Sequence, residues 1–94
     1  MNHYVYLKFP GEKVDSKIYD LMEQTVHQAR DEIDGFQSYQ IMKSEQEHAN
    51  TCSVLIELTF DDQRTKDLYL MHPLHRSMLQ QIKSAIIDKA IFDA

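Results

Sequence analysis

The sequence predicts an α+β domain of the ferredoxin-like, split βαβ type, with elements in the order β-α-β-β-α-α-β. Three observations carry this prediction: strand-like alternation at residues 3–9 and 51–60, helical spacing of apolar residues from Val14 to about Ile33, and a proline inside the second helical region. The fold is a four-stranded antiparallel sheet with its helices on one face. Since 94 residues leave room for one hydrophobic core, we expect a single domain over residues 1–94.

The first half of the chain predicts a strand, a helix and a second strand. Along residues 3–9, one side of the first strand carries His3, Val5, Leu7 and Phe9. The helix then runs from Val14 to about Ile33, with a polar reverse face. Gly35 ends it, because glycine takes the left-handed conformation without steric cost. Residues 36–44 are predicted as the second strand.

The second half predicts a strand, a broken helix and a last strand. Residues 51–60 put Cys52, Val54, Ile56, Leu58 and Phe60 on one face. Asp61 or Asp62 caps a short helix that runs to about Met71. Pro73 cannot extend that helix but suits the start of another, which reaches about Ala85. Residues 86–93 close the chain as a strand.

Composition excludes several classes of protein. The formal net charge of -5 and a pI of about 5.4 argue against a nucleic acid or an anionic membrane as partner. No apolar run approaches the roughly 20 residues that span a bilayer, and the first residues lack a signal-peptide pattern, so we expect a cytoplasmic protein. Cys52 is the only cysteine, which excludes an intrachain disulfide, and we expect it to be a buried packing residue.

The face of the sheet that carries no helix predicts a partner surface. It would present Tyr4, Tyr6, Leu55 and other large side chains to solvent. A two-fold symmetric dimer that packs sheet against sheet is the simplest way to cover it. We therefore expect a homodimer.

Titratable side chains are concentrated in "YLMHPLHRSML", residues 69–79. At about 100° per residue, His75 falls in the middle of an apolar arc with Met78, and Tyr69 shares an inward stripe with Thr65, Leu68 and His72. An inward imidazole needs hydrogen-bond partners, which a tyrosine hydroxyl can supply, and His3 could join the cluster. We take His75 and Tyr69 as candidate catalytic residues. The candidate ligand-binding residues are His3, Val5, Leu7, Val54, His72 and Met78.

Several landmarks resemble the stress-responsive A/B-barrel (Dabb) family: "HYVYLKF", "DGF", "ELTF", "YLMHPLH" and "IFD", in order along nearly the whole chain. The resemblance implies a dimeric α/β barrel built from two ferredoxin-like units. The plant polyketide-cyclase branch of that family uses a tyrosine and a histidine that correspond to Tyr69 and His75, and a first-strand histidine that matches His3. This chain has Val54 where that branch has an inward histidine, so the resemblance implies a less polar pocket.

Three kinds of function stay open at this point. The pocket could bind a small hydrophobic or carbonyl-containing molecule, or it could catalyse an aldol-type closure. In the second case His75, with an unperturbed pKa of about 6.5, would be the general base and Tyr69 the orienting group. Alternatively, His75 is a satisfied core histidine in a purely structural stress protein. Monooxygenases that share this architecture are a rival enzyme class. A cavity beneath Tyr69 and His75 would favour binding or catalysis over structure.

We expect no metal and no cofactor. His72 and His75 have no carboxylate within their motif to complete a ligand set. The sequence contains no glycine-rich phosphate loop and no recognisable cofactor motif. His27 and His48 are expected to be solvated.

Overall fold

The computed structural model describes residues 1–11, 14–45 and 51–94, so His48 lies outside the described residues. Its elements are β1 (Asn2–Lys8), α1 (Ser16–Glu32), β2 (Phe36–Lys43), β3 (Val54–Phe60), α2 (Gln63–Met71), α3 (Pro73–Ile82), a 3₁₀ turn (Lys83–Ala85) and β4 (Asp88–Asp93). The strands pair antiparallel in the order β2-β3-β1-β4. The predicted ferredoxin-like order of elements is confirmed.

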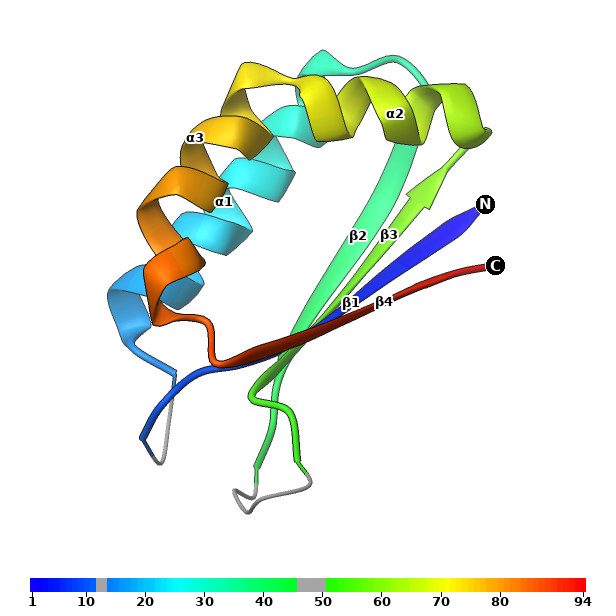
Figure 1. Cartoon of the computed structure of the whole chain (residues 1–94). Helices are drawn as coiled ribbons and strands as arrows, with labels where there is room; N and C mark the ends of the chain where they lie inside the picture. Colours follow the sequence, from blue (N-terminus) through cyan, green and yellow to red (C-terminus); the bar gives the residue numbers. More distant parts are fainter. Residues whose placement is uncertain (12–13, 46–50) are drawn as a thin grey trace.

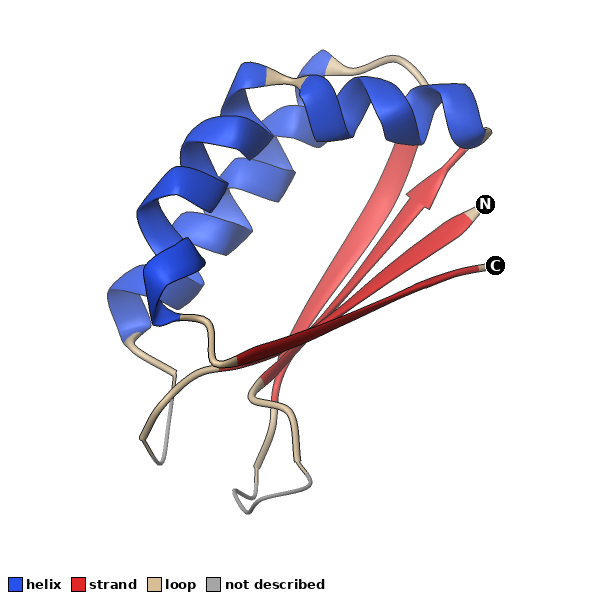
Figure 2. Cartoon of the chain, viewed as in Figure 1, coloured by secondary structure: helices blue, strands red, loops and turns tan. Residues whose placement is uncertain are grey.

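The molecule has two layers (Figure 1). Figure 2 shows all helices on one face of the sheet, and no helix or strand of the described chain covers the other face. We call these the inner and the open face. The two chain termini lie side by side at one end of the sheet, where the amide of Asn2 donates to the carbonyl oxygen of Ala94 over 2.7 Å.

The predicted start of the second helical region and its predicted break at Pro73 are both confirmed. The Asp62 side chain accepts a hydrogen bond from the amide of Thr65 at the start of α2. α2 ends at Met71, His72 is extended with a ψ of 141°, and Pro73 begins α3. α3 itself ends at Ile82, three residues before the predicted end, because the chain tightens into the 3₁₀ turn that Ile86 closes by donating to Lys83.

Two strand boundaries were predicted too early. β3 begins at Val54 rather than at residue 51, and β4 begins at Asp88 rather than at residue 86. Ser53 donates its amide to the carbonyl of Leu7 before regular pairing starts, so the alternation of β3 does not extend back to Cys52. Cys52 is consequently not a buried packing residue; it is partly exposed and borders a hollow on the open face.

The core lies between the inner face and the helices. β3 contributes alternate residues from Val54 to Phe60, as predicted, and α1 contributes Met22, Val26 and Ala29. Rings of Phe36 and Phe60 pack 4.6 Å apart between centroids. Leu68 was predicted to face inward with Tyr69, but its side chain is 51% exposed, because α2 runs past the end of the sheet and only part of its stripe is covered.

Gly35 occupies a position that other residues fit poorly. Its φ is +90°, and a Cβ atom added there would lie 2.8 Å from Oγ1 of Thr65. We expect Gly35→Ala to lower the free energy of unfolding by about 1–3 kcal/mol, measured by urea denaturation. Gly11, exposed and with a φ of 92°, provides the control for backbone strain alone. An equal loss for Gly11→Ala would mean that the contact with Thr65 contributes nothing.

Candidate functional site

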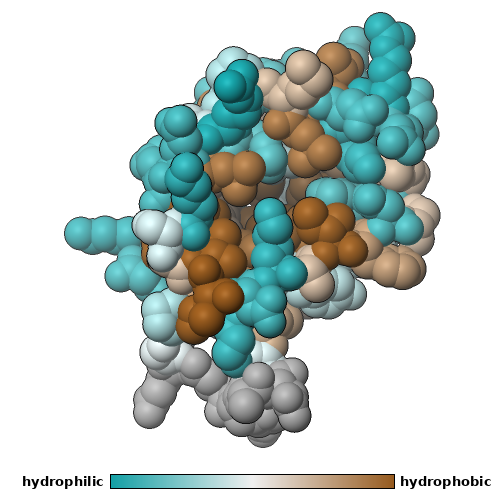
Figure 3. All heavy atoms as spheres, in the orientation of Figure 1, coloured by the Kyte–Doolittle hydropathy of each residue, from teal (hydrophilic) through white to brown (hydrophobic). Residues whose placement is uncertain are grey.

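A pocket of about 120 Å³ lies between the inner face and helices α2 and α3; we call it the interior pocket. Most of its wall is aliphatic, from β1, β3, β4 and α3. In Figure 3, which shows the side of the molecule where β4 lies, hydrophobic side chains reach the surface in separate groups among hydrophilic ones. Six of the predicted site residues line the pocket: His3, Val5, Leu7, Tyr69, His75 and Met78. That they bind a ligand stays a prediction.

Two residues predicted for the pocket do not line it. Val54 has no exposed surface and packs in the core at the start of β3. His72 caps α3, since its Nδ1 accepts from the amide of Leu74 over 3.1 Å. Its Nε2 lies 3.5 Å from a carboxylate oxygen of Glu32 in α1. The imidazole of His72 therefore connects α3 with α1 instead of facing the pocket.

His75 projects from the first turn of α3 into the interior pocket. Its Nδ1 lies 3.0 Å from the carbonyl oxygen of Leu70. Because a carbonyl only accepts, Nδ1 carries the hydrogen in the neutral ring, which leaves the lone pair on Nε2. Burial holds the pKa of His75 below its usual value, with smaller contributions from His3 and Lys89, and the bond to Leu70 opposes the shift. The ring is therefore a neutral base near pH 7.

Tyr69 packs against His75 with 4.7 Å between ring centroids. We expected the tyrosine hydroxyl to serve as a hydrogen-bond partner of the imidazole, directly or through one water; the structure shows no direct bond, and within the described chain the Tyr69 hydroxyl has no hydrogen-bond partner. No buried side-chain oxygen or nitrogen there lacks a partner, so the hydroxyl must be accessible, and Tyr69 lines the interior pocket. Burial raises the pKa of Tyr69 well above its ordinary value, which keeps the phenol a hydrogen-bond donor.

His3 is held by two residues for which we had predicted no role. His3 and Asp93 are directly opposite each other on β1 and β4, and Nδ1 of His3 donates to Oδ1 of Asp93 over 2.5 Å. The ammonium of Lys66, on α2 and buried, reaches the other oxygen of Asp93 at 3.2 Å. Asp93 belongs to the "IFD" landmark, and nothing else in the sequence pointed to a role for it in the site. In its neutral form His3 would, like His75, have its lone pair on Nε2, because Nδ1 donates to Asp93.

We expect Asp93→Asn to destabilise the protein at neutral pH, and the difference to shrink as the pH falls below about 4. The hydrogen bond from His3 and then that from Lys66 hold the pKa of Asp93 below its ordinary value of 3.8. The ionised carboxylate therefore stabilises the fold above that value, and this stabilisation is lost as the pH falls through the folded pKa.

Urea unfolding from pH 2 to pH 7 measures this difference. Asp88→Asn is the matched control, because Asp88 is on the same strand and its carboxylate accepts only from the neighbouring amide of Lys89 among the described residues. A difference between wild type and Asp93→Asn that stays constant across the whole range would contradict the prediction.

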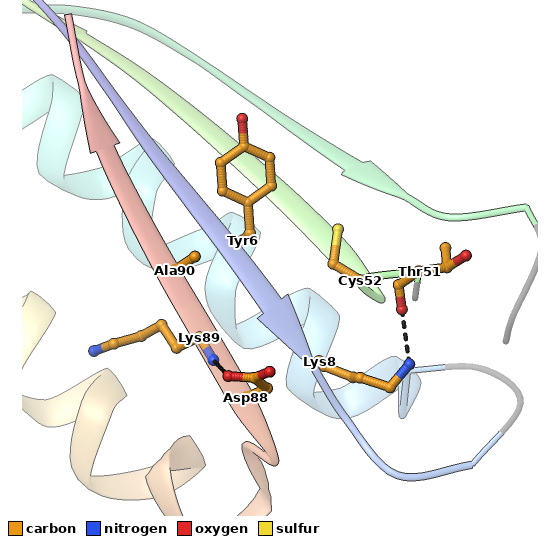
Figure 4. A pocket seen from close by; sticks show the side chains of 7 residues that line it. All are labelled: Tyr6, Lys8, Thr51, Cys52, Asp88, Lys89 and Ala90. Carbon is orange, nitrogen blue, oxygen red and sulfur yellow. Dashed lines mark hydrogen bonds between the residues drawn. The ribbon is translucent and has the colours of Figure 1, made fainter. Parts of the chain in front are cut away.

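A second hollow, of about 290 Å³, lies on the open face and was not predicted (Figure 4). It is lined by Tyr6, Lys8, Thr51, Cys52, Asp88, Lys89 and Ala90. The Lys8 ammonium donates to the carbonyl of Thr51 over 2.8 Å. This outer hollow has both charged and apolar residues in its wall, and it lies beside the large exposed side chains of the open face.

Among the described residues, no three histidine, cysteine, aspartate or glutamate side chains are grouped so that they could hold a metal ion. None of the helices in the described ranges is long and apolar enough to cross a bilayer.

Comparison with known proteins decides the family. The sequence profile of the stress responsive A/B barrel domain matches residues 1–94. The chain belongs to this family. No curated protein sequence is similar enough to count as a relative.

Solved structures of low sequence identity share the fold of this A/B barrel domain. A dimeric ferredoxin-like protein of unknown function from Jannaschia sp. CCS1 is 18% identical with a TM-score of 0.82, over 99% of this chain and 95% of that one. The hydroxynitrile lyase of Passiflora edulis is 10% identical with a TM-score of 0.74, over 97% and 87%. SnoaB, a cofactor-independent oxygenase from Streptomyces nogalater, is 12% identical with a TM-score of 0.72, over 99% and 90%. At these identities the similarity shows the fold alone.

Proposed function

We propose that this A/B barrel domain binds a small, mainly apolar molecule with a carbonyl group in the interior pocket. The observation that carries the proposal is an apolar cavity whose wall includes the Tyr69 phenol, which has no hydrogen-bond partner among the residues that the structure describes. About 120 Å³ is close to the roughly 150 Å³ of an apolar cavity that takes up benzene. The Tyr69 hydroxyl is then a donor for the carbonyl oxygen, and the aliphatic wall holds the rest of the ligand. A space of this size also argues against the purely structural alternative.

Proton transfer beside a carbonyl is the second candidate function. It is favoured by the hydrogen bonds of both imidazoles, since Nδ1 of His3 and of His75 is bonded to an acceptor, and Nε2 of each has no hydrogen-bond partner among the described residues. A carboxylate behind a histidine fixes its tautomer and stabilises the imidazolium, as Asp93 would do for His3. His75 would take the proton next to the carbonyl, while Tyr69 donates to the oxygen as negative charge develops. The hydroxynitrile lyase and the cofactor-independent oxygenase are precedents for enzymes on this fold.

A pair of probes tests the binding proposal. Acetophenone and ethylbenzene have similar shapes, but only acetophenone carries a carbonyl. We expect the wild type to bind acetophenone about fivefold more tightly than ethylbenzene, because the carbonyl accepts one hydrogen bond from Tyr69. In Tyr69→Phe this hydrogen bond is lost, so the two probes should bind equally. Shifts in the NMR signals of His3 and His75 measure binding. Tyr19→Phe is the control, since the Tyr19 hydroxyl donates to Ile41 outside the pocket. Failure of both probes to shift these signals would overturn the proposal.

The same probe tests the catalytic candidate without a known substrate. In heavy water, a base beside the bound ketone exchanges the methyl hydrogens of acetophenone for deuterium. We expect the wild type to accelerate this exchange and His75→Gln to lose the acceleration while still binding the ketone. Binding without acceleration in the wild type would leave the protein a binding protein only.

We also propose that the domain works as a homodimer joined through its open faces. Large side chains on that face are exposed in one chain, among them Tyr6 (37%), Met42 (39%) and Phe92 (58%). Covering them would bury apolar surface and the outer hollow together. The Jannaschia protein with the same fold is described as dimeric.

A further inference from the structure

The side chain of Lys89 borders the interior pocket, and binding of a neutral carbonyl compound does not use its charge. Lys89 is opposite Leu7 in the pairing of β1 and β4, so it belongs to the inner face with His3 and Ile91. In Figure 4 its side chain extends to the other side of β4 from Tyr6 and Cys52, although Lys89 is also one of the residues that line the outer hollow. β4 is one of the two edge strands and Lys89 is exposed, so this ammonium lies at the rim where the pocket meets solvent.

No carboxylate of the described chain neutralises Lys89. Its backbone amide donates to the carboxylate of Asp88, but within the described ranges no ion pair involves its side-chain ammonium. Asp93 is the nearest acidic residue on the inner face of β4, and both its oxygens are taken by His3 and Lys66. The charge of Lys89 is also felt inside the pocket, since it contributes to lowering the pKa of His75.

This local positive charge stands out in an acidic protein. The formal net charge of the chain is -5, so the protein as a whole does not attract an anionic ligand. Beyond about 8 Å, physiological salt screens that repulsion, and the nearest charge decides. At the pocket rim the nearest charge is an uncompensated ammonium.

We propose that Lys89 selects ligands that carry a carboxylate, so that the natural ligand is a small apolar acid with its carboxylate at the rim. The inference rests on the proposed binding in the interior pocket. A single ammonium matches the single charge of a carboxylate. A phosphate would need more donors, such as a glycine-rich loop of backbone amides, and the described pocket wall contains no glycine.

Benzoate and benzamide are the probes for this inference, because they share a ring and a carbonyl oxygen and differ in charge. We expect benzoate to bind about fivefold more tightly than benzamide, the upper range for an ion pair near solvent. Lys89→Met should remove the preference without changing the affinity for benzamide, and Lys89→Arg should retain it. The preference should also fall with added salt in the wild type. Histidine NMR signals measure both affinities.

Lys8→Met is the matched control. Lys8 follows Leu7, the partner of Lys89 on β1, so the variant removes the same charge nearby but on the open face. It should leave the preference for benzoate intact. Equal binding of both probes by the wild type, or a preference that survives Lys89→Met, would overturn the role of Lys89 and leave the pocket proposal standing. Loss of binding for both probes, together with acetophenone, would overturn the pocket proposal and this inference with it.

Discussion

Phe60→Ala is expected to lower the free energy of unfolding by about 3–5 kcal/mol, the range for removing a buried aromatic ring. Phe60 ends β3, has no exposed surface, and packs against Phe36 at 4.6 Å and Tyr69 at 5.7 Å between ring centroids. The cavity left behind is enclosed by rigid rings and cannot collapse easily. A domain of this size has about 5–15 kcal/mol of stability in total, so the variant would be close to unfolding at physiological temperature.

Urea denaturation at 25 °C measures this loss, and Leu68→Ala is the control. Leu68 precedes Tyr69 on α2 but is 51% exposed, so its truncation should cost less than about 1 kcal/mol. Similar losses in both variants would mean that the rings do not form the core that supports Tyr69. Because Tyr69 loses a neighbour in Phe60→Ala, we also expect the pocket of any folded remainder to bind acetophenone more weakly.

Sequence patterns predicted most of the fold because the apolar residues of most strands and helices recur with a clear period. The alternation along β1 placed His3 and Leu7 on the inner face, and the proline placed the break between α2 and α3. Errors arose where tertiary position overrides a local period. Leu68 follows the helical stripe but is half exposed, and Cys52 follows the alternation of β3 but precedes regular pairing.

The candidate site was predictable in part. Helical spacing brought Tyr69 and His75 to one place, and their rings are in contact. The hydrogen bond of His75 was not predictable from spacing, because it depends on a carbonyl left free at the end of α2. Pro73 has no amide hydrogen, and the amide of Leu74 donates to His72, so the carbonyl of Leu70 is free to accept from His75.

Long-range pairing explains what was missed. His3 and Asp93 are 90 residues apart in sequence, and only the register of β1 against β4 brings them together. The alternation of each strand fixes which face a residue takes, but not which residue is opposite it. The contribution of Lys66 depends in turn on where α2 crosses that edge of the sheet. A lysine in a short helix gives no sign of this in the sequence.

Leu55→Asp is expected to convert the proposed homodimer fully into monomers. Leu55 is on β3, a central strand, and faces the open side of the sheet between Tyr6 and Met42, its partners on β1 and β2. In one chain an aspartate there still meets water, so the fold should survive. In a sheet-to-sheet dimer the two-fold axis would bring a second aspartate close, and both charges would be buried without a partner, at a cost of several kcal/mol.

Light scattering coupled to size exclusion distinguishes the two states at micromolar concentration. The wild type should have twice the 11.1 kDa mass of one chain, and Leu55→Asp should have that mass itself with an unchanged circular dichroism spectrum. Leu68→Asp is the matched control, because it adds the same charge at an exposed leucine on the helical side, and it should stay dimeric. A wild type of 11.1 kDa would refute the homodimer, whereas a dimeric Leu55→Asp would refute only the open face as its interface, since a dimer that survives two charges there must be joined elsewhere.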